Sequence, residues 1–240
     1  HRQNRNQIER MAPKSVVITG QYDRKEEQPK GPQDSFTSIN KSGEYKRKES
    51  AHRDFVVPGS KFEPEAGRYH LYVSLACPWA CGTLSMLFEK GLEDIISHSI
   101  VHPTWGKTKE SEEDTHCGWL FKAPGDAPVS NPLGHGSFDC DDALVPDSVC
   151  NAKNLREVYE VGGNPTGPFS TPVLFDKRTN SIVNNESKEI LRIFNSAFDS
   201  FAKSPGLSIF PPELEAELVE LNDTLIYPKI NNGVYRAGFA

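Results

Sequence analysis

A strand-forming run that passes through Cys77 and Pro78 into a helical run restricts the fold of this chain more than any other feature. Residues 69–76, "YHLYVSLA", are rich in β-forming side chains and predict a strand. Proline is well tolerated at the first position of a helix. Residues 79–92 carry apolar side chains at helical spacing, with Gly91 as a stop signal. We therefore expect a strand and a helix, with Cys77 at the helix N-terminus.

The patterns that follow extend this unit along the chain. In chain order they predict a strand over 94–101, a loop-rich stretch over 102–147, a helix over 151–161, strands over 171–176 and 181–183, a helix with Ile190, Leu191, Ile193 and Phe194 on its inner face, and an amphipathic helix over 213–231. Asn184 or Asn185 is expected to cap the helix after the last strand. The order β-α-β-α-β-β-α predicts an α/β protein with a thioredoxin-like fold, followed by one helix of a further domain.

Charge is unevenly distributed along the 240 residues, which carry a net charge of −6. Residues 1–53 hold 12 Lys and Arg against 7 Asp and Glu, whereas the remainder holds 15 against 26. An acidic body disfavours contact with a nucleic-acid backbone, and the basic, polar head is typical of a solvated tail. No run approaches the ~18 apolar residues of a membrane span, and no N-terminal segment resembles a secretory signal. We expect neither nucleic-acid nor membrane partners.

Five cysteines stand at positions 77, 81, 117, 140 and 150. An odd number without a secretory signal favours reduced thiols and an intracellular protein, which we expect to be cytoplasmic rather than mitochondrial. Their spacing fits no zinc template, so we expect no metal.

Cys77 is the strongest candidate for a catalytic residue. A thiol just before a helix N-terminus faces the positive end of the helix dipole and unpaired backbone N–H groups, which favour the thiolate. Cys81 lies four residues later, so the pair is not the C-x-x-C of dithiol oxidoreductases. A monothiol mechanism that uses an external thiol is the more natural expectation. Packing accounts best for Cys81, and the alternatives are an inert Cys77 or a Cys77–Cys81 disulfide.

Thr171 and Pro172 open a predicted strand and are candidates for ligand binding. We expect a cis peptide bond there, as the thioredoxin-like order favours, and it would expose the Thr171 backbone to a bound peptide; a trans edge-strand proline is the alternative. Trp119, within "CGWLF", is expected either in the core or as the roof of an apolar pocket that accepts aromatic groups.

Glu186 and Ser187 begin a predicted helix and form a second candidate binding pair. A backbone N–H and a hydroxyl at that place can bind a carboxylate, while Glu186 can pair with an ammonium group. Ordinary helix capping is the alternative. An α-amino acid head group would satisfy both residues at once, which fits a γ-glutamyl group.

Four segments carry a resemblance to a known family: C-P-W-A at 77–80, "GWLF" at 118–121, "TPVLFDKRTNSIVNNESKEILRIFNSAF" at 171–198, and "IYPKINNGVYRAGFA" at 226–240. They resemble the glutathionyl-hydroquinone reductases, the Xi class of the glutathione transferase superfamily. The resemblance implies a thioredoxin-like domain, an all-helical domain and a homodimer. The expected domains are a disordered or extended segment over 1–52, a thioredoxin-like glutathione-binding domain over 53–203, and a linker with the first helix of an incomplete helical domain over 204–240.

The resemblance also implies a reaction with glutathione as co-substrate. Cys77 would attack the sulfur of a glutathionyl-hydroquinone and form a mixed disulfide, from which a second glutathione would release oxidised glutathione. Trp119 and Tyr235 would line the site, with the Tyr235 hydroxyl assisting at the phenolic oxygens of the substrate. The remaining binding residues would hold glutathione: Thr171, Pro172, Glu186 and Ser187.

Two departures from the family pattern stand out. Family members carry C-P-W-A-H-R or C-P-W-A-S-R, whereas Cys81 and Gly82 follow here. This removes a positive charge near the thiol and puts a glycine inside the helix, at a cost of about 1 kcal/mol relative to alanine. The chain also ends where the helical domain has barely begun, so we expect it to be truncated there. The alternatives to the reductase are an omega-like thiol transferase or dehydroascorbate reductase, and a truncated, non-catalytic glutathione-binding protein.

Overall fold

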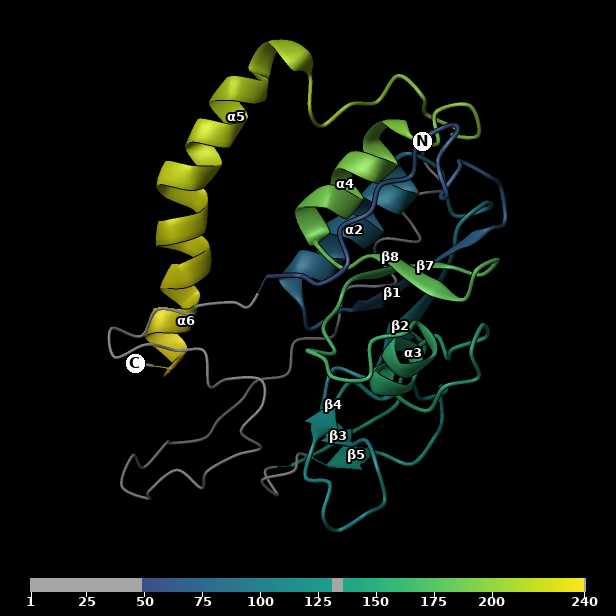
Figure 1. Cartoon of the computed structure of the whole chain (residues 1–240). Coiled ribbons are helices and arrows are strands. Elements are labelled where there is room, and N and C mark those ends of the chain that lie inside the picture. The colour runs from purple at the N-terminus through teal and green to yellow at the C-terminus, as the bar shows by residue number, and fades with distance from the viewer. Residues whose placement is uncertain (1–48, 131–135, 240) are drawn as a thin grey trace. The chain divides into compact units, whose positions relative to one another are not determined.

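The computed structural model describes residues 49–130 and 136–239, without the side chains of residues 235, 238 and 239. Its elements, in chain order, are β1 (Tyr69–Ser74), α2 (Pro78–Glu89), β2 (Ser97–Val101), β3 (Gly106–Lys107), β4 (Cys117–Gly118), β5 (Val129–Ser130), β6 (Ser137–Phe138), α3 (Leu155–Val161), β7 (Val173–Asp176), β8 (Ser181–Asn184), α4 (Ser187–Ser196), a 3-10 turn (Pro212–Leu214), α5 (Glu215–Leu221), a π-helical stretch (Asn222–Asn231) and α6 (Asn232–Phe239) (Figure 1). Among these ranges, no helix is long and apolar enough to cross a membrane. The disordered or extended segment predicted over 1–52 lies, up to residue 48, outside the described residues.

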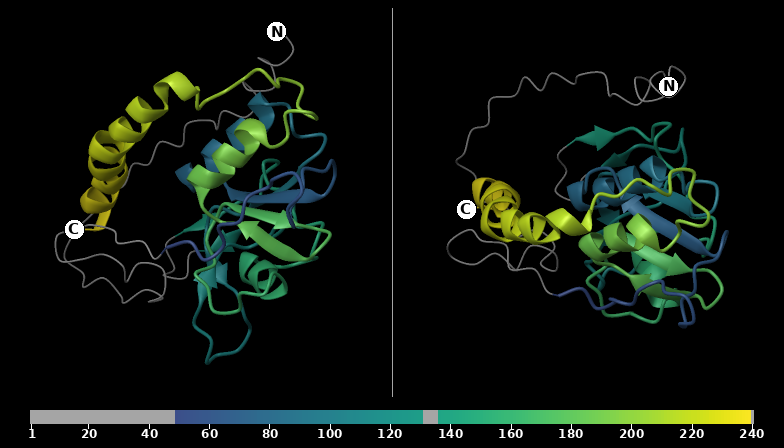
Figure 2. Two further views of the ribbon diagram at one scale, coloured as in Figure 1. Left: turned by 45° about the horizontal axis from the view of Figure 1, so that its top comes forward. Right: turned by 90° about the horizontal axis from the view of Figure 1, so that it is seen from above.

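A four-stranded sheet with the order β2-β1-β7-β8 forms the centre of the fold. β1 is parallel to β2 and antiparallel to β7, and the β7–β8 hairpin completes the sheet. α2 and α4 pack side by side on one face, and α3 packs on the other (Figures 1 and 2). This order and these layers confirm the predicted α/β thioredoxin-like fold.

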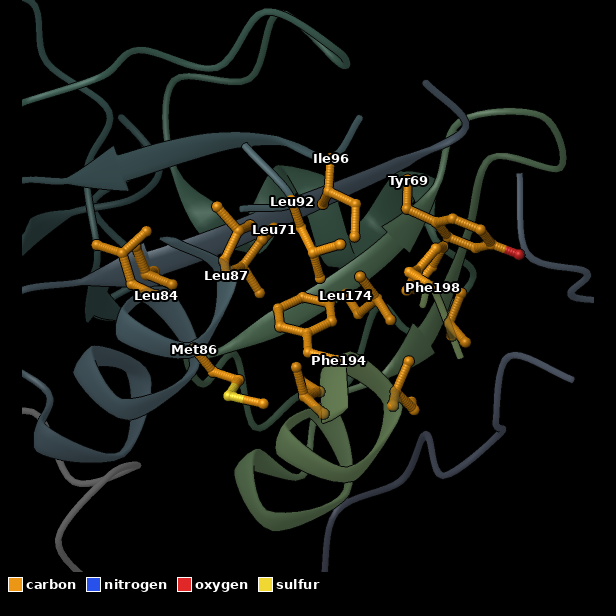
Figure 3. Packing of buried hydrophobic residues seen from close by; sticks show 14 of the residues in the cluster. Tyr69, Leu71, Leu84, Met86, Leu87, Leu92, Ile96, Leu174, Phe194 and Phe198 are labelled. Atoms are coloured by element: carbon orange, nitrogen blue, oxygen red, sulfur yellow. The ribbon is translucent and has the colours of Figure 1, made fainter. Parts of the chain in front are cut away.

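Alternating side chains of β1 supply both hydrophobic cores. Leu71 and Val73 belong to the cluster beneath α2 and α4, together with Leu87 and Phe194 (Figure 3). Tyr72 belongs to the cluster beneath α3 instead. A strand covered on both faces needs consecutive residues that tolerate burial, and all six residues of β1 are buried. Both helix layers therefore pack against the run that predicted the strand.

Element boundaries follow the predictions to within a few residues. The helix expected over 151–161 begins at Leu155, because Asn154 is its N-cap and accepts the Glu157 N–H at 3.3 Å. Beyond the end of α2, Gly91 has a φ of 66°, a conformation that favours glycine. In the described part of the stretch predicted as loop-rich, which omits residues 131–135, the strands are the short pairs β3–β4 and β5–β6.

The predicted capping of α4 by Asn184 or Asn185 is wrong, since the N-cap residue is Glu186. Both asparagines are buried and bind groups from distant parts of the chain. Asn184 accepts the Glu186 N–H at 2.7 Å and donates to the Asp54 carbonyl at 3.0 Å. Asn185 donates to the Tyr159 hydroxyl at 3.0 Å. Their side chains tie β8 to its neighbours, so neither is the helix cap.

Residues 50–54, which we call the edge segment, run along β8. The Asp54 N–H donates to the Val183 carbonyl at 3.0 Å, and the Asn185 N–H donates to the His52 carbonyl at 3.0 Å. Arg53 forms an antiparallel bridge with Asn184. The edge segment thereby covers hydrogen-bonding groups that an edge strand would otherwise leave open.

Buried Lys90 fixes the chain that follows α4. Its ammonium donates to the carbonyl oxygens of Asn195, Pro205 and Leu207 at 2.9, 3.2 and 3.0 Å, and it forms a salt bridge with Asp199. A buried charge is tolerated only when it is paired and hydrogen-bonded. The linker expected from residue 204 therefore starts at a fixed point on the ends of α2 and α4.

The C-terminal helix departs from regular α geometry. Predicted over 213–231, it runs as α5, the π-helical stretch and α6, and the π-helical stretch contains Pro228. Proline lacks the N–H that an α-helix needs, and π-helical turns accommodate such interruptions. None of the residues of α5 or of the π-helical stretch is buried.

A buried ion pair joins the start of β1 to the end of β7. Arg68 donates to both carboxylate oxygens of Asp176, from Nε at 2.9 Å and from Nη2 at 2.7 Å. Burial raises the pKa of Asp176, but hydrogen bonds from Arg68 and Thr179 outweigh burial and hold the pKa below its ordinary value. The same carboxylate therefore locks the β1–β7 register and the turn after β7.

We predict that Asp176→Asn lowers the free energy of unfolding by about 3 kcal/mol at pH 7, because it leaves the Arg68 charge buried without its partner. Urea unfolding followed by circular dichroism measures this change. The folded-state pKa of Asp176 is depressed, so its stabilisation is fully present above the unfolded value of about 3.9. It is lost as the pH falls through the folded-state pKa. The difference between wild type and variant should therefore shrink below about pH 4.

Asp142→Asn is the matched control, since Asp142 is exposed. It should change the free energy of unfolding by less than about 0.5 kcal/mol. Equal effects of the two substitutions would contradict the assigned role of the buried pair.

Candidate active site

Cys77 is the N-cap residue of α2, with extended backbone angles (φ −103°, ψ 107°). Its carbonyl accepts the N–H groups of Ala80 and Cys81, both at 3.0 Å, and Pro78 follows at the first helical position. The side chain makes no capping hydrogen bond, and the free thiol is half-buried. The thiol therefore stands at the helix N-terminus, where the sequence predicts it.

The β1–β7 pairing brings Thr171 next to Cys77. Because the register pairs Tyr72 with Val173, the loop after β1 and the residues before β7 meet at one edge of the sheet. Cys77 Sγ lies 3.7 Å from the Thr171 carbonyl oxygen, and the peptide bond from Thr171 to Pro172 is cis, as predicted. The Thr171 hydroxyl is buried and has no hydrogen-bond partner among the described residues. Such an unpaired buried group needs an explanation.

The N-terminus of α4 holds the second predicted pair. Ser187 is only 2% exposed, and Glu186 is half-buried. Glu186 Oε2 accepts a hydrogen bond from Ser50 Oγ at 3.0 Å, and the same hydroxyl lies 3.3 Å from the Asn185 carbonyl oxygen. Ser50 belongs to the edge segment, so a residue 136 positions away orients the carboxylate. Sequence reasoning missed Ser50 because no local pattern links the two positions.

A cavity of about 430 Å³ is lined by the edge segment, the first turn of α2, one side of α4 and the π-helical stretch. Trp79, in the first turn of α2, lines it together with Glu186 and Lys188. The ring of Tyr227 also lines the cavity, with its centroid 6.3 Å from the Trp79 ring and 5.2 Å from Lys188 Nζ. Aromatic and charged groups of both signs share this wall, so the cavity suits a ligand with apolar and ionic parts.

Trp119 and Cys77 pack against different core clusters. Trp119 is half-buried and packs against the core cluster beneath α3, with its ring 5.3 Å from that of Trp105 in an edge-to-face contact. Cys77 packs against the other cluster, beneath α2 and α4. Tyr235 falls within α6, but its side chain lies outside the part of the chain that the structure describes.

Cys81 is half-buried, and its thiol is free. Its S–H group donates to the Leu75 carbonyl at 3.4 Å and lies 3.9 Å from the Ser74 carbonyl. Burial and the neighbouring Cys77 raise the pKa of Cys81. The alternative of a Cys77–Cys81 disulfide is therefore not the state seen here.

A larger cavity, of about 510 Å³, lies near α3 and has an ion pair in its lining. Arg156 pairs with Asp114 at 2.8 Å and with Glu160 at 3.2 Å. None of the predicted site residues lines it. The Cys77 thiol, the unpaired Thr171 hydroxyl, and Glu186 with Ser187, which we call the head-group pair, lie instead at the edge of the sheet where α2 and α4 begin. This edge is the candidate active site.

The thioredoxin-like domain and the free thiol at the N-terminus of its first helix place the chain in the class of thiol-dependent proteins. Comparison with known proteins identifies the family within this class. The glutathione S-transferase N-terminal domain family matches residues 76–197. Glutathionyl-hydroquinone reductase PcpF of Sphingobium chlorophenolicum is 40% identical over 207 residues, covering 85% of this chain and 56% of that protein. Glutathione S-transferase omega-like 2 of Schizosaccharomyces pombe is 38% identical over 206 residues, covering 84% and 57%.

Solved structures give the same result. The Xi glutathione transferase of Phanerochaete chrysosporium matches with a TM-score of 0.66 and 40% identity, over 82% of this chain and 59% of that one. The glutathione-bound YqjG structure from Escherichia coli matches with a TM-score of 0.59 and 39% identity, over 79% and 56%. The chain belongs to the glutathione S-transferase N-terminal domain family, and its relatives include glutathionyl-hydroquinone reductases and Xi-class glutathione transferases. It spans less than two thirds of the length of these relatives.

Gly82 provides a test of how charge affects Cys77. It lies inside α2, and apart from its chain neighbours and the adjacent helix backbone no heavy atom lies within 4 Å of the place that a Cβ would occupy. Gly82→Ala is expected to raise the free energy of unfolding by about 1 kcal/mol. Gly82→Arg adds a positive charge about one and a half helical turns after the thiol, so iodoacetamide should alkylate Cys77 faster than in the alanine variant. Equal alkylation rates in the two variants would contradict this expectation.

Proposed function

We propose that this protein is a glutathione-dependent reductase that removes glutathione from glutathionyl-hydroquinones through a Cys77–glutathione mixed disulfide. The observation that carries the proposal is the half-buried Cys77 thiol at a helix N-terminus, 3.7 Å from the carbonyl of Thr171, whose buried hydroxyl has no partner among the described residues. A peptide ligand bound to the thiol could pair with both groups of Thr171. Family membership supports the same chemistry, since relatives are named for it.

The α4 N-terminus supports a γ-glutamyl head group in this proposal. The backbone N–H groups and the Ser187 hydroxyl would receive its α-carboxylate, which helix N-termini favour. The Glu186 carboxylate, oriented by Ser50, would pair with its ammonium group. Pro172 would hold Thr171 just before β7, and glutathione would extend from Glu186 toward Cys77. By family resemblance, Trp119 and Tyr235 would line the hydroquinone part of the site.

In the first proposed step, the Cys77 thiolate forms a bond to the sulfur of the conjugate. The bond between that sulfur and the ring carbon breaks, and its electron pair goes to the ring carbon. That carbon takes up a proton, so the ring leaves as the free hydroquinone. The glutathione sulfur is oxidised to the disulfide level, and the ring is reduced.

In the second proposed step, a second glutathione loses its thiol proton and attacks the glutathionyl sulfur of the mixed disulfide. Cys77 leaves as the thiolate, and oxidised glutathione forms. The sum converts one conjugate and one glutathione into one hydroquinone and one oxidised glutathione. No metal takes part in this scheme.

One observation favours a second candidate function. A relative at 38% identity is named omega-like, and an omega-like thiol transferase or dehydroascorbate reductase would use the same Cys77 mixed disulfide with a different oxidised substrate. A non-catalytic glutathione-binding protein is the third candidate, since Cys81 and Gly82 stand where the family pattern carries a basic residue after C-P-W-A.

The central test is turnover of a glutathionyl-hydroquinone with glutathione, followed by release of hydroquinone. Cys77→Ser is expected to reduce turnover to the rate without protein, because a hydroxyl cannot form the disulfide. Cys150→Ser is the matched control, since Cys150 packs against the cluster beneath α3 and not beside Cys77. Turnover of dehydroascorbate alone would favour the omega-like function. Glutathione binding without turnover of either substrate would favour the non-catalytic protein.

Ser50→Ala tests the proposed head-group site separately. Loss of the hydrogen bond that orients Glu186 should weaken glutathione binding by about 1 kcal/mol, or about fivefold in Kd. Isothermal titration calorimetry with reduced glutathione measures this change. Ser200→Ala, at an exposed serine, should leave Kd unchanged. An unchanged Kd for Ser50→Ala would contradict the proposed role of Ser50 in orienting Glu186 for glutathione binding.

A further inference from the structure

The chain carries a second thiol one helical turn after Cys77, and the proposed reaction does not use it. Cys81 is half-buried, like Cys77, and both thiols are free. The Cys81 N–H donates to the Cys77 carbonyl at 3.0 Å, so the first turn of α2 sets the spacing between the two residues. Both side chains belong to the same rigid element.

Helix geometry places the two cysteines within disulfide range. Residues four apart in a helix have Cα atoms about 6 Å from each other, and disulfides span Cα distances of about 4.4 to 6.8 Å. Helical side chains lean toward the helix N-terminus. Cys81 follows this rule, because its Sγ lies 3.4 Å from the Leu75 carbonyl oxygen, in the loop that precedes Cys77. The second thiol therefore leans toward the turn that carries the first.

We propose that Cys81 is a resolving thiol, which attacks the Cys77–glutathione mixed disulfide when free glutathione is scarce. This proposal rests on the mixed disulfide of the proposed function. The Cys81 thiol loses its proton, and its sulfur bonds to the sulfur of Cys77. The Cys77–glutathione bond breaks, and its electron pair leaves on glutathione, which takes up a proton. The products are a Cys77–Cys81 disulfide and one free glutathione.

The surroundings of Cys81 make this route slower than attack by abundant glutathione. Its S–H is held by backbone carbonyl oxygens, and burial raises its pKa, so the thiolate fraction at neutral pH is small. Exchange rates fall with that fraction. The internal route therefore competes only when the external thiol is depleted, and it returns the bound glutathione.

The Cys77–Cys81 disulfide is reopened by the co-substrate itself. One glutathione thiolate attacks the Cys77 sulfur and releases Cys81 as a thiol, which restores the mixed disulfide. A second glutathione then releases oxidised glutathione and the Cys77 thiolate. In the disulfide form, Cys77 is protected from the irreversible steps of sulfur oxidation.

The test uses oxidised glutathione to load Cys77, so it does not require hydroquinone turnover. Wild type, Cys81→Ser and Cys77→Ser are incubated with oxidised glutathione, rapidly desalted, and followed by intact-mass spectrometry in the absence of thiols. Wild type should first carry glutathione and then lose it, ending two hydrogens lighter than the reduced protein. Peptide mapping without reductant should locate the new bond between Cys77 and Cys81.

The variants separate the outcomes. Cys81→Ser should keep its glutathione under the same conditions, because a serine hydroxyl can donate to the same carbonyls but cannot resolve the disulfide. Cys77→Ser should carry no glutathione in the first turn of α2. Retention of glutathione by wild type for as long as by Cys81→Ser would overturn the proposal, as would a disulfide between other cysteines. Failure of wild type to load Cys77 at all would instead overturn the mixed disulfide of the proposed function.

Discussion

The antiparallel register between β1 and β7 is the constraint on which the site depends. It pairs Tyr72 with Val173, so the residues after one strand and before the other meet at a single edge. Cys77 and Thr171 are far apart in the sequence, yet their side chain and carbonyl come within 3.7 Å. At the opposite end, Tyr69 is paired with Asp176, beside the buried pair that this aspartate forms with Arg68. A one-residue slip would turn every side chain of β7 to the other face.

The two cores hold that register from both sides. β1 sends Leu71 and Val73 into the cluster beneath α2 and α4 and Tyr72 into the cluster beneath α3. Neither helix layer can move along the strand without losing contacts with the alternate buried residues that face it. The thiol stands where β1 leaves this packed region, so it combines a fixed backbone with a half-exposed side chain.

Sequence reasoning succeeded where the signal was local. The strand, Pro78 and the helical run specify the surroundings of Cys77 within about twenty residues, and the structure has them as predicted. It failed at α4, where Asn184 and Asn185 carry suitable capping side chains but bind distant groups. It missed Ser50 for the same reason, since its bond to Glu186 exists only after β8 has received the edge segment. Tertiary contacts determine which partners these side chains bind, and local sequence propensity does not contain that information.

The edge segment couples the free energy of ligand binding at Glu186 to the free energy of its own attachment to β8. Ser50 contacts Glu186, while Asp54 and His52 are joined to the backbone of Val183 and Asn185. Any molecule that binds better when the segment is in place must, by reciprocity, strengthen the attachment of the segment to β8. Ligand binding at Glu186 and Ser187 would then slow the hydrogen exchange of the Asp54 and Asn185 amides, which attach the edge segment to β8.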